Sequence, residues 1–288
     1  MQWSDALGKL HGRYGGTPRI VSLVPSLTEL LVALGLAEHL VGRTGFCIHP
    51  RQVVRRIPKL GGTKGFKLER LRALKPTHVI VNIDENRREE VEALADFVPH
   101  VIVTHPLTAR DNLDLYRLLG GVFGRETEAE ELCAGFENAW TALTRQTAAL
   151  PRQRVLYLIW REPWLSVARD TYISHMLAAA GWDTLPLEST VRYPEIDLHA
   201  LAGAAEIVLL ASEPYPFRVQ HLRQLRELLP GTQSALIDGE MVSWYGSRAI
   251  DGLRYLRELR ARMAAPSSTS STGPGPLLPK DLMTPLRR

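Results

Sequence analysis

Cysteine and histidine side chains in predicted loops are the residues best suited to contact a metal. Cys47 and His49 form a Cys-x-His pair, and His105 lies in a neighbouring loop. A thiolate and imidazoles can bind a transition metal directly, or touch the metal of a bound chelate from its axial side. A closed zinc site usually takes four ligands with a second close pair, which is not evident here. We therefore favour an axial contact to the metal of a ligand, with His49 as first candidate, over a resident metal; each histidine also has an ordinary structural role as an alternative.

Polar side chains at Asp84, Glu85 and Asn86 follow an apolar strand and precede a helical stretch. Asp84 is suited to cap that helix, and acids favour the positive end of the helix dipole. The alternative is that all three face a cleft and accept hydrogen bonds from ligand amides. An arginine can hold a carboxylate or phosphate by two hydrogen bonds. Three further charged candidates for polar ligand edges are Arg161, Glu162 and Arg248.

Aromatic residues gather in loops that follow predicted strands, among them Trp160, Trp164 and Trp244. Loop aromatics that face a cleft suit a large flat ligand such as a corrin or porphyrin; the alternative is that they pack inside or between lobes. Ligands of open parallel sheets bind beyond the carboxyl ends of the strands. The remaining ligand-binding candidates in such loops are Ser26, Leu27, Thr28, Phe46, Thr63, Lys64, Phe66, Asn82, Tyr193 and Tyr215.

The segment from Arg19 to Pro50 shows how one such loop is built. An apolar strand at 20–24 leads through a Pro-Ser turn into a helix at 27–34, which Gly35 ends; a second strand follows near 39–41. Ser26 and Glu29 have the spacing of a capping box. A helix that starts just beyond a strand directs its free N–H groups into a crevice, which suits polar or anionic ligand groups.

Short apolar runs alternate with helical stretches in two blocks, which predicts two α/β lobes with parallel sheets. We expect an N-terminal arm with little structure (1–17), a first lobe (18–125), a connecting helix (126–150), a second lobe (151–263) and a disordered tail (264–288). The connecting helix follows a break at Gly120-Gly121 or Gly124, and it predicts a rigid rod rather than a flexible hinge. The expected strands are 20–24, 39–41, 78–82, 101–104, 155–159, 207–210 and 235–237; the expected helices outside the rod are 27–34, 68–74, 87–97, 171–180, 218–229 and 247–263.

Composition narrows the functional classes. The 288 residues carry a net charge of +4 with scattered arginines, and no nucleic-acid motif is present. Phosphate-loop, GxSxG, HExxH and Rossmann glycine patterns are absent, so we expect no enzyme. Two cysteines give a weak disulfide signal. The first residues have no apolar signal-peptide core, and no apolar run is long enough to span a bilayer, which as written predicts a cytoplasmic protein.

Three stretches resemble a known family: Arg19–Pro50, Gly61–Thr63 with Leu68–Ile80, and Ile237–Glu240 with Trp244–Arg248. They are similar to the class III substrate-binding proteins of ABC importers, the helical-backbone metal receptors, and most to their cobalamin-binding branch. The resemblance covers about residues 18 to 263. It implies two Rossmann-like lobes joined by a long backbone helix, a ligand cleft between the lobes and a periplasmic or extracytoplasmic location.

The resemblance also implies roles for single residues. Thr63, Asn82 and Tyr193 fall near positions where the vitamin B12-binding proteins place cleft aromatics, and only Tyr193 is aromatic here. In the family, one exposed glutamate on each lobe docks onto the permease. Glu69 matches the first position, while His199 stands where the second glutamate is expected.

Our leading hypothesis is a monomeric, non-catalytic protein that binds a corrinoid such as cobalamin between its lobes. It needs no cofactor of its own, and its partners are the metal chelate and an ABC permease with its ATPase. The alternatives are binding of a ferric siderophore or haem, and an intracellular trafficking protein or enzyme for a corrinoid or metal on the same fold. A weaker alternative is a scaffold or regulatory module with no small-molecule ligand.

Overall fold

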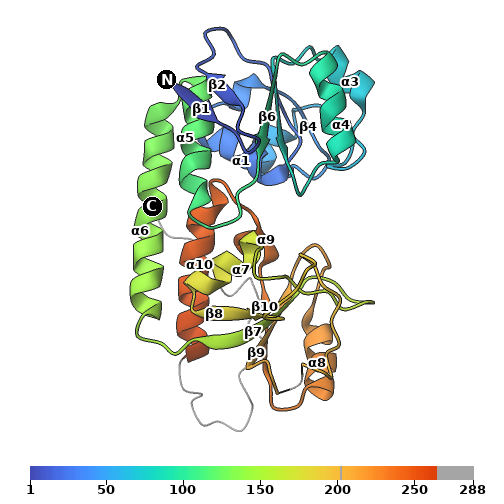
Figure 1. Cartoon of the computed structure of the whole chain (residues 1–288), viewed down its shortest axis with the longest axis vertical. Helices are drawn as coiled ribbons and strands as arrows, with labels where there is room; N and C mark the ends of the chain where they lie inside the picture. The colour runs from blue at the N-terminus through green and yellow to red at the C-terminus, as the bar shows by residue number, and fades with distance from the viewer. Residues whose placement is uncertain (202, 265–288) are drawn as a thin grey trace. The chain divides into compact units, whose positions relative to one another are not determined.

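The computed structural model describes residues 1–201 and 203–264, in two units (Figure 1). Unit 1 comprises Met1–Pro106, Arg110–Phe136 and Tyr245–Arg248; unit 2 comprises Leu107–Ala109, Glu137–Trp244 and the described residues from Ala249 onward. Each unit holds one four-stranded sheet whose strands all run parallel. The predicted α/β class with two parallel sheets is therefore confirmed. The tail predicted to be disordered lies outside the described residues, except for Ala264.

The sheet of unit 1 has the strand order β4-β3-β5-β6. Its strands are β3 (Ile20–Ser22), β4 (Leu40–Arg43), β5 (His78–Asn82) and β6 (His100–Thr104). Every residue of β5 is buried, as expected for a central parallel strand covered on both faces. Val79 and Val81 point to the same face and pack with Leu71 and Leu94 in one apolar cluster.

Short helices connect the strands of unit 1. They are α1 (Pro25–Ala33), η1 (Ala37–His39), α2 (Arg51–Val54), α3 (Leu68–Ala73), α4 (Arg88–Glu92) and η2 (Ala93–Asp96). The single helix predicted over 87–97 is thus an α-helical turn followed by a 3₁₀ turn. The 3₁₀ turn ends at Asp96, just before Phe97 and Val98 pack in the core cluster.

An N-terminal hairpin replaces the arm that the sequence predicts to have little structure. Strands β1 (Gln2–Ser4) and β2 (Leu10–Gly12) pair antiparallel. Buried Asp5 holds the turn by accepting hydrogen bonds from Leu7 N–H, Lys9 N–H and the His11 ring. The Ala6 N–H donates to the Val103 carbonyl at 2.9 Å, so the hairpin covers the edge of β6.

Two long helices follow the first sheet. Helix α5 (Asp111–Phe123) ends at Gly124, whose left-handed backbone (φ 66°) closes the helix. Of the two predicted breaks, Gly124 is therefore the correct one. Gly121 lies inside α5, where a side chain would collide with the Trp3 ring of the hairpin. Helix α6 (Glu126–Thr147) confirms the long helix predicted to start at residue 126.

The sheet of unit 2 has the order β10-β9-β7-β8. Its strands are β7 (Gln153–Leu158), β8 (Trp182–Leu185), β9 (Ile207–Ala211) and β10 (Gln233–Ile237). Strand β8 was not predicted. The helices are α7 (Tyr172–Ala179), α8 (Val219–Leu228), α9 (Gly239–Ser243) and α10 (Arg248–Ala264).

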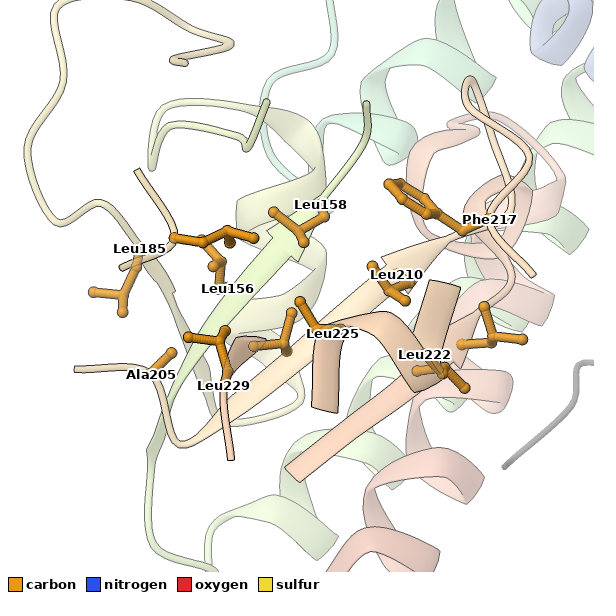
Figure 2. Close-up of a cluster of buried hydrophobic side chains, with 12 residues drawn as sticks. Leu156, Leu158, Leu185, Ala205, Leu210, Phe217, Leu222, Leu225 and Leu229 are labelled. Atoms are coloured by element: carbon orange, nitrogen blue, oxygen red, sulfur yellow. The ribbon is translucent and has the colours of Figure 1, made fainter. Parts of the chain in front are cut away.

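The core of unit 2 forms between the sheet and α8, as Figure 2 shows. Leu156 and Leu158 project from β7 and Leu210 from β9. Leu222 and Leu225 meet them from one face of α8. Because this packing fixes the β7 and β9 backbones, it also fixes the loops that leave their carboxyl ends.

Candidate functional site

The loops after β7 and β9 separate at the switch point of the unit 2 sheet. From β7 the chain proceeds to β8 on one side, while β9 lies on the other. In open parallel sheets the crevice at such a point is the usual ligand site. The Tyr215 N–H donates to the Ile159 carbonyl at 3.3 Å, so the two loops are joined at their base.

Four aromatic rings pack together in these two loops. Phe217 belongs to the apolar core of unit 2, and Trp164 and Tyr215 pack against that core. The Trp160 ring lies edge-on to Tyr215, with centroids 5.6 Å apart. Tyr215 contacts Phe217 at 4.6 Å, and Phe217 lies parallel to Trp164 at 6.1 Å. Phe217 is buried, whereas Trp160 is exposed. We call Trp160, Trp164, Tyr215 and Phe217 the aromatic strip: a packed base that presents an indole to the outside, suited to a flat apolar ligand.

Charged groups border the aromatic strip. The Arg161 guanidinium lies 5.7 Å from the Trp164 ring centre, donates to Gln224 Oε1 at 2.8 Å and pairs with Glu162 at 3.3 Å. Glu162 is exposed and has a left-handed backbone (φ 63°), which is uncommon for a non-glycine residue and recurs at functional sites.

A buried histidine lies behind the aromatic strip. Burial, with Arg161 and Arg218 nearby, lowers the pKa of His221, so its ring is neutral near pH 7. Its Nδ1 accepts the Arg218 N–H at 2.9 Å and thereby caps α8. The imidazole also packs against the rings of Tyr215 and Phe217.

Two further predicted residues of unit 2 lie on other loops. Tyr193 is exposed, and the Ala168 and Ser166 N–H groups hold its loop by donating to the carbonyls of Arg192 and Pro194. Trp244 follows α9, and its indole N–H donates to Glu213 Oε1 at 2.9 Å. Both residues are therefore held in place by contacts within unit 2.

Helix α1 differs from its predicted start. It begins at Pro25, with Val24 at the N-cap and no side-chain cap, so the predicted capping box of Ser26 and Glu29 is wrong. Pro25 supplies the first-turn geometry instead. Ser26, Leu27 and Thr28 are buried. Thr28 Oγ1 lies 2.8 Å from Ser22 Oγ and 2.9 Å from the Val24 carbonyl, so it holds the turn after β3.

Two buried asparagines shape the loop after β5. Asn82 Oδ1 accepts the Asp84 N–H at 2.8 Å, and Asn86 Oδ1 accepts the Asn82 N–H at 2.9 Å. Asn86 Nδ2 also donates to the Thr63 carbonyl at 2.8 Å. These amides are used within the protein. The predicted cap at Asp84 is wrong, because α4 begins at Arg88 with Arg87 at its N-cap.

Several predicted residues of unit 1 do reach its surface, from the loops after β4, β5 and β6. Asp84 and His105 lie side by side, with Oδ2 and Nε2 3.3 Å apart. Burial raises the pKa of Glu85, although Lys64 opposes the rise. The members of this set are Phe46, His49, Thr63, Lys64, Asp84, Glu85 and His105.

Cys47 is a structural residue. Its thiol is buried beside Thr44 Oγ1 at 3.1 Å, and burial raises its pKa. A neutral buried thiol is a poor soft ligand. Phe66 likewise belongs to the apolar core of unit 1. Among residues 1–201 and 203–264, no group of three or more His, Cys, Asp or Glu side chains is arranged to hold a metal ion.

The remaining predicted residues have clear positions. Glu69, in the first turn of α3, has a side chain that is 89% exposed. His199 is exposed, and its N–H donates to Asp197 Oδ1 at 2.8 Å. Arg248, predicted to contact the ligand, forms a two-point ion pair with Glu29.

Sequence reasoning missed two residues that build the site, Phe217 and Glu213. Phe217 stands two positions after Tyr215, and that spacing of aromatics in a strand-end loop is the signal that could have identified it. Glu213 lies in the bend after β9, two residues beyond Ala211. Its bond to Trp244 joins residues 31 positions apart, and no local pattern in the sequence reveals such a contact.

Comparisons with known proteins agree on one family. The family model described as "Periplasmic binding protein" matches residues 20–232. A vitamin B12-binding protein of Photorhabdus laumondii is 23% identical over 202 residues, which cover 70% of this chain and 73% of the relative. One from Vibrio parahaemolyticus is 24% identical, with 67% and 70% coverage.

Solved structures show the same fold. The periplasmic vitamin B12 binding protein of Vibrio cholerae superposes with a TM-score of 0.75 at 17% identity, covering 85% of this chain and 97% of that chain. A periplasmic heme-binding protein from Roseiflexus sp. RS-1 gives 0.76 at 22% identity, with 87% and 100% coverage. None of the helices in the described part of our chain combines the length and apolar character needed to cross a bilayer.

Proposed function

Because the chain belongs to the periplasmic binding protein family, we propose that it binds a corrinoid, with cobalamin as the reference ligand. The membership confirms the resemblance drawn from the sequence and the expectation of a binding protein rather than an enzyme. The observation that carries the proposed ligand is the aromatic strip at the switch point of unit 2, with exposed Trp160 at its end. Relatives named as vitamin B12-binding proteins support it.

In the proposed binding mode, aromatic rings that are exposed on strand-end loops contact the ligand. The candidates are Trp160 and Tyr193 in unit 2 and Phe46, from the loop after β4, in unit 1. Affinity then comes from apolar area and a few polar contacts. Trp160→Ala and Phe46→Ala test the two units separately, and a substitution that lowers the affinity identifies a unit whose ring contacts the ligand.

Visible absorbance tests the proposal directly. Purified protein is titrated with cyanocobalamin, cobinamide, haem and a ferric siderophore, and the spectra are followed to saturation. We expect a spectral shift and a micromolar or tighter dissociation constant for the corrinoids. If none of the four ligands binds, the proposed function is wrong.

Haem is the second candidate. Structural neighbours titled as heme-binding proteins have TM-scores as high as those of the corrinoid binder. His49 and His105, which are partly exposed on unit 1, are our candidates for an axial ligand to an iron or cobalt. Haem binding with a Soret shift that His49→Ala or His105→Ala abolishes, without corrinoid binding, would favour this candidate. A further alternative is an intracellular carrier of the same ligands.

The proposal extends to transport. Glu69 is well placed to dock on a basic permease surface because its carboxylate projects into solvent. We propose an exported, monomeric protein that delivers its ligand to an ABC permease. Cell fractionation and size-exclusion chromatography test compartment and oligomeric state. Recovery only from the cytoplasmic fraction would favour the intracellular carrier.

A further inference from the structure

The Glu213 carboxylate holds two side chains that end helix α9. Its Oε1 accepts hydrogen bonds from the Trp244 indole N–H and the Ser243 hydroxyl, each at 2.9 Å. The start of α9 also lies against Glu213 itself. A Cβ at Gly239 would lie 2.6 Å from Glu213 Cγ, so the close approach of the helix to this side chain requires a glycine.

We propose that Glu213 is a positioning residue that holds the Trp244 indole in the orientation a ligand meets, and that protonation of Glu213 weakens ligand binding. This inference rests on the proposed function, because Trp244 contacts a ligand only within that proposal. The bond itself belongs to unit 2 and does not depend on any ligand.

The groups around Glu213 disfavour its charge. Burial raises the pKa of Glu213, and the nearby carboxylates of Glu240 and Asp238 raise it further, while the hydrogen bonds from Ser243 and Trp244 oppose the rise. Tyr157 on β7 also lies in this environment. Burial raises the pKa of Tyr157, so this phenol stays neutral. Glu213 therefore takes up a proton at a higher pH than an ordinary glutamate.

Protonation changes the strength of the hydrogen bond to Trp244. A hydrogen bond to an ionised carboxylate is roughly twice as strong as one to a neutral acceptor. When Glu213 is neutral, the indole is held less firmly, and ordering it on binding costs more. Affinity should then fall as the pH drops through the pKa of Glu213. Replacement by glutamine keeps an acceptor oxygen but removes the titration.

A ligand-free experiment tests the coupling first. In protein labelled with ¹⁵N-tryptophan, the Trp244 indole resonance is assigned by its loss in Trp244→Phe and followed from neutral to acid pH. We expect it to shift in a single titration above the ordinary glutamate range, and to lose that titration in Glu213→Gln. The Trp160 indole in the same samples is the control. An unchanged titration in Glu213→Gln would overturn the inference.

Ligand affinity then separates the two proposals. We expect the dissociation constant of cyanocobalamin to rise about fivefold as the pH falls from neutral through the pKa of Glu213, and to be independent of pH in Glu213→Gln. Glu240→Gln should move the transition to lower pH, because it removes a neighbouring negative charge. Equal pH dependence in wild type and Glu213→Gln overturns the positioning role. Absence of binding at every pH overturns the proposed function instead, and the role of Glu213 in binding with it.

Discussion

Glu29 and Arg248 form a two-point ion pair, with Nε–Oε2 at 2.8 Å and Nη2–Oε1 at 2.9 Å, across 219 positions of sequence. Their side chains are 22% and 11% exposed. The same late segment is fixed at Gly246, whose N–H donates to Asn112 Oδ1 and whose carbonyl accepts the Tyr116 hydroxyl. Residues 245–248 are thus built into unit 1, against α1 and α5.

Removal of Glu29 is expected to destabilise unit 1. Glu29→Ala removes two hydrogen bonds and one negative charge from the partly buried Arg248 guanidinium, at a cost of about 2 kcal/mol in free energy of unfolding. Urea denaturation measures it. The control is Glu130→Ala, which breaks the Arg117–Glu130 pair; that pair also has two hydrogen bonds but is 46% and 58% exposed. We expect less than about 0.5 kcal/mol there. Equal losses in free energy of unfolding would show that the Glu29–Arg248 pair contributes no more to stability than the exposed pair.

Acid is expected to destabilise unit 1 through His78. Its ring is buried, stacks on His100 at 4.6 Å and meets Tyr14 edge-on. Burial, together with His100 and His11, lowers the pKa of His78 to about 3 from the usual 6.5. Below about pH 6.5 the unfolded chain binds a proton that the folded protein does not. Stability contributed by neutral His78 is therefore complete above that pH and falls as the pH drops toward 3.

The size of the acid effect follows from the same pKa values. Each pH unit between them corresponds to about 1.4 kcal/mol, so about 2 kcal/mol should be lost by pH 5. His78→Phe keeps a ring but does not titrate, so its free energy of unfolding should depend less on pH than that of wild type. His199→Gln, at an exposed position, is the matched control. Parallel pH profiles for His78→Phe and wild type would contradict the prediction.

The sequence predicts best those strands that are buried on both faces, because such strands have a continuous run of apolar residues. Strand β9 reads Ile-Val-Leu-Leu-Ala and is wholly buried, so local composition identifies it. Strand β8 was missed because Asp183 and Thr184 interrupt its apolar run, and its pairing with β7 is a long-range property. The N-terminal hairpin was missed for a related reason, since its contacts with Val103 and Gly121 lie about a hundred residues away.

In the candidate site, too, the sequence locates some residues and leaves the partners of others unknown. Loop aromatics at 160, 164 and 215 were found because strand-end loops can be located from the strands, and the structure brings these rings together. The partners of polar side chains could not be found locally. Glu29 has the spacing of a capping residue, yet it pairs with Arg248 far along the chain. Asn86 resembles a ligand contact in sequence, yet its amide serves the backbone of unit 1.

The exposed end of the aromatic strip should contribute affinity without contributing much stability. We expect Trp160→Ala to weaken corrinoid binding at least about tenfold, because an aromatic face that a ligand covers contributes more than 1 kcal/mol. Isothermal titration measures it. Leu228→Ala is the matched control, since Leu228 and Trp160 are each 40% exposed. Equal affinities for Trp160→Ala and Leu228→Ala would remove Trp160 from the site.

If Glu69 docks on a permease as proposed, its removal should affect transport and leave ligand binding unchanged. Glu69→Gln removes an 89% exposed carboxylate that lies 4.0 Å from Arg72, so the affinity for the ligand should stay at the wild-type value. Stimulation of the ATPase of the cognate permease, reconstituted in liposomes, should fall several-fold. His199→Glu, which adds a second negative charge at the exposed position in unit 2, should raise stimulation above wild type.

Glu89→Gln changes an exposed first-turn acid of α4 and is the control for charge alone. If it lowers stimulation as much as Glu69→Gln does, general surface charge and not a specific contact governs docking.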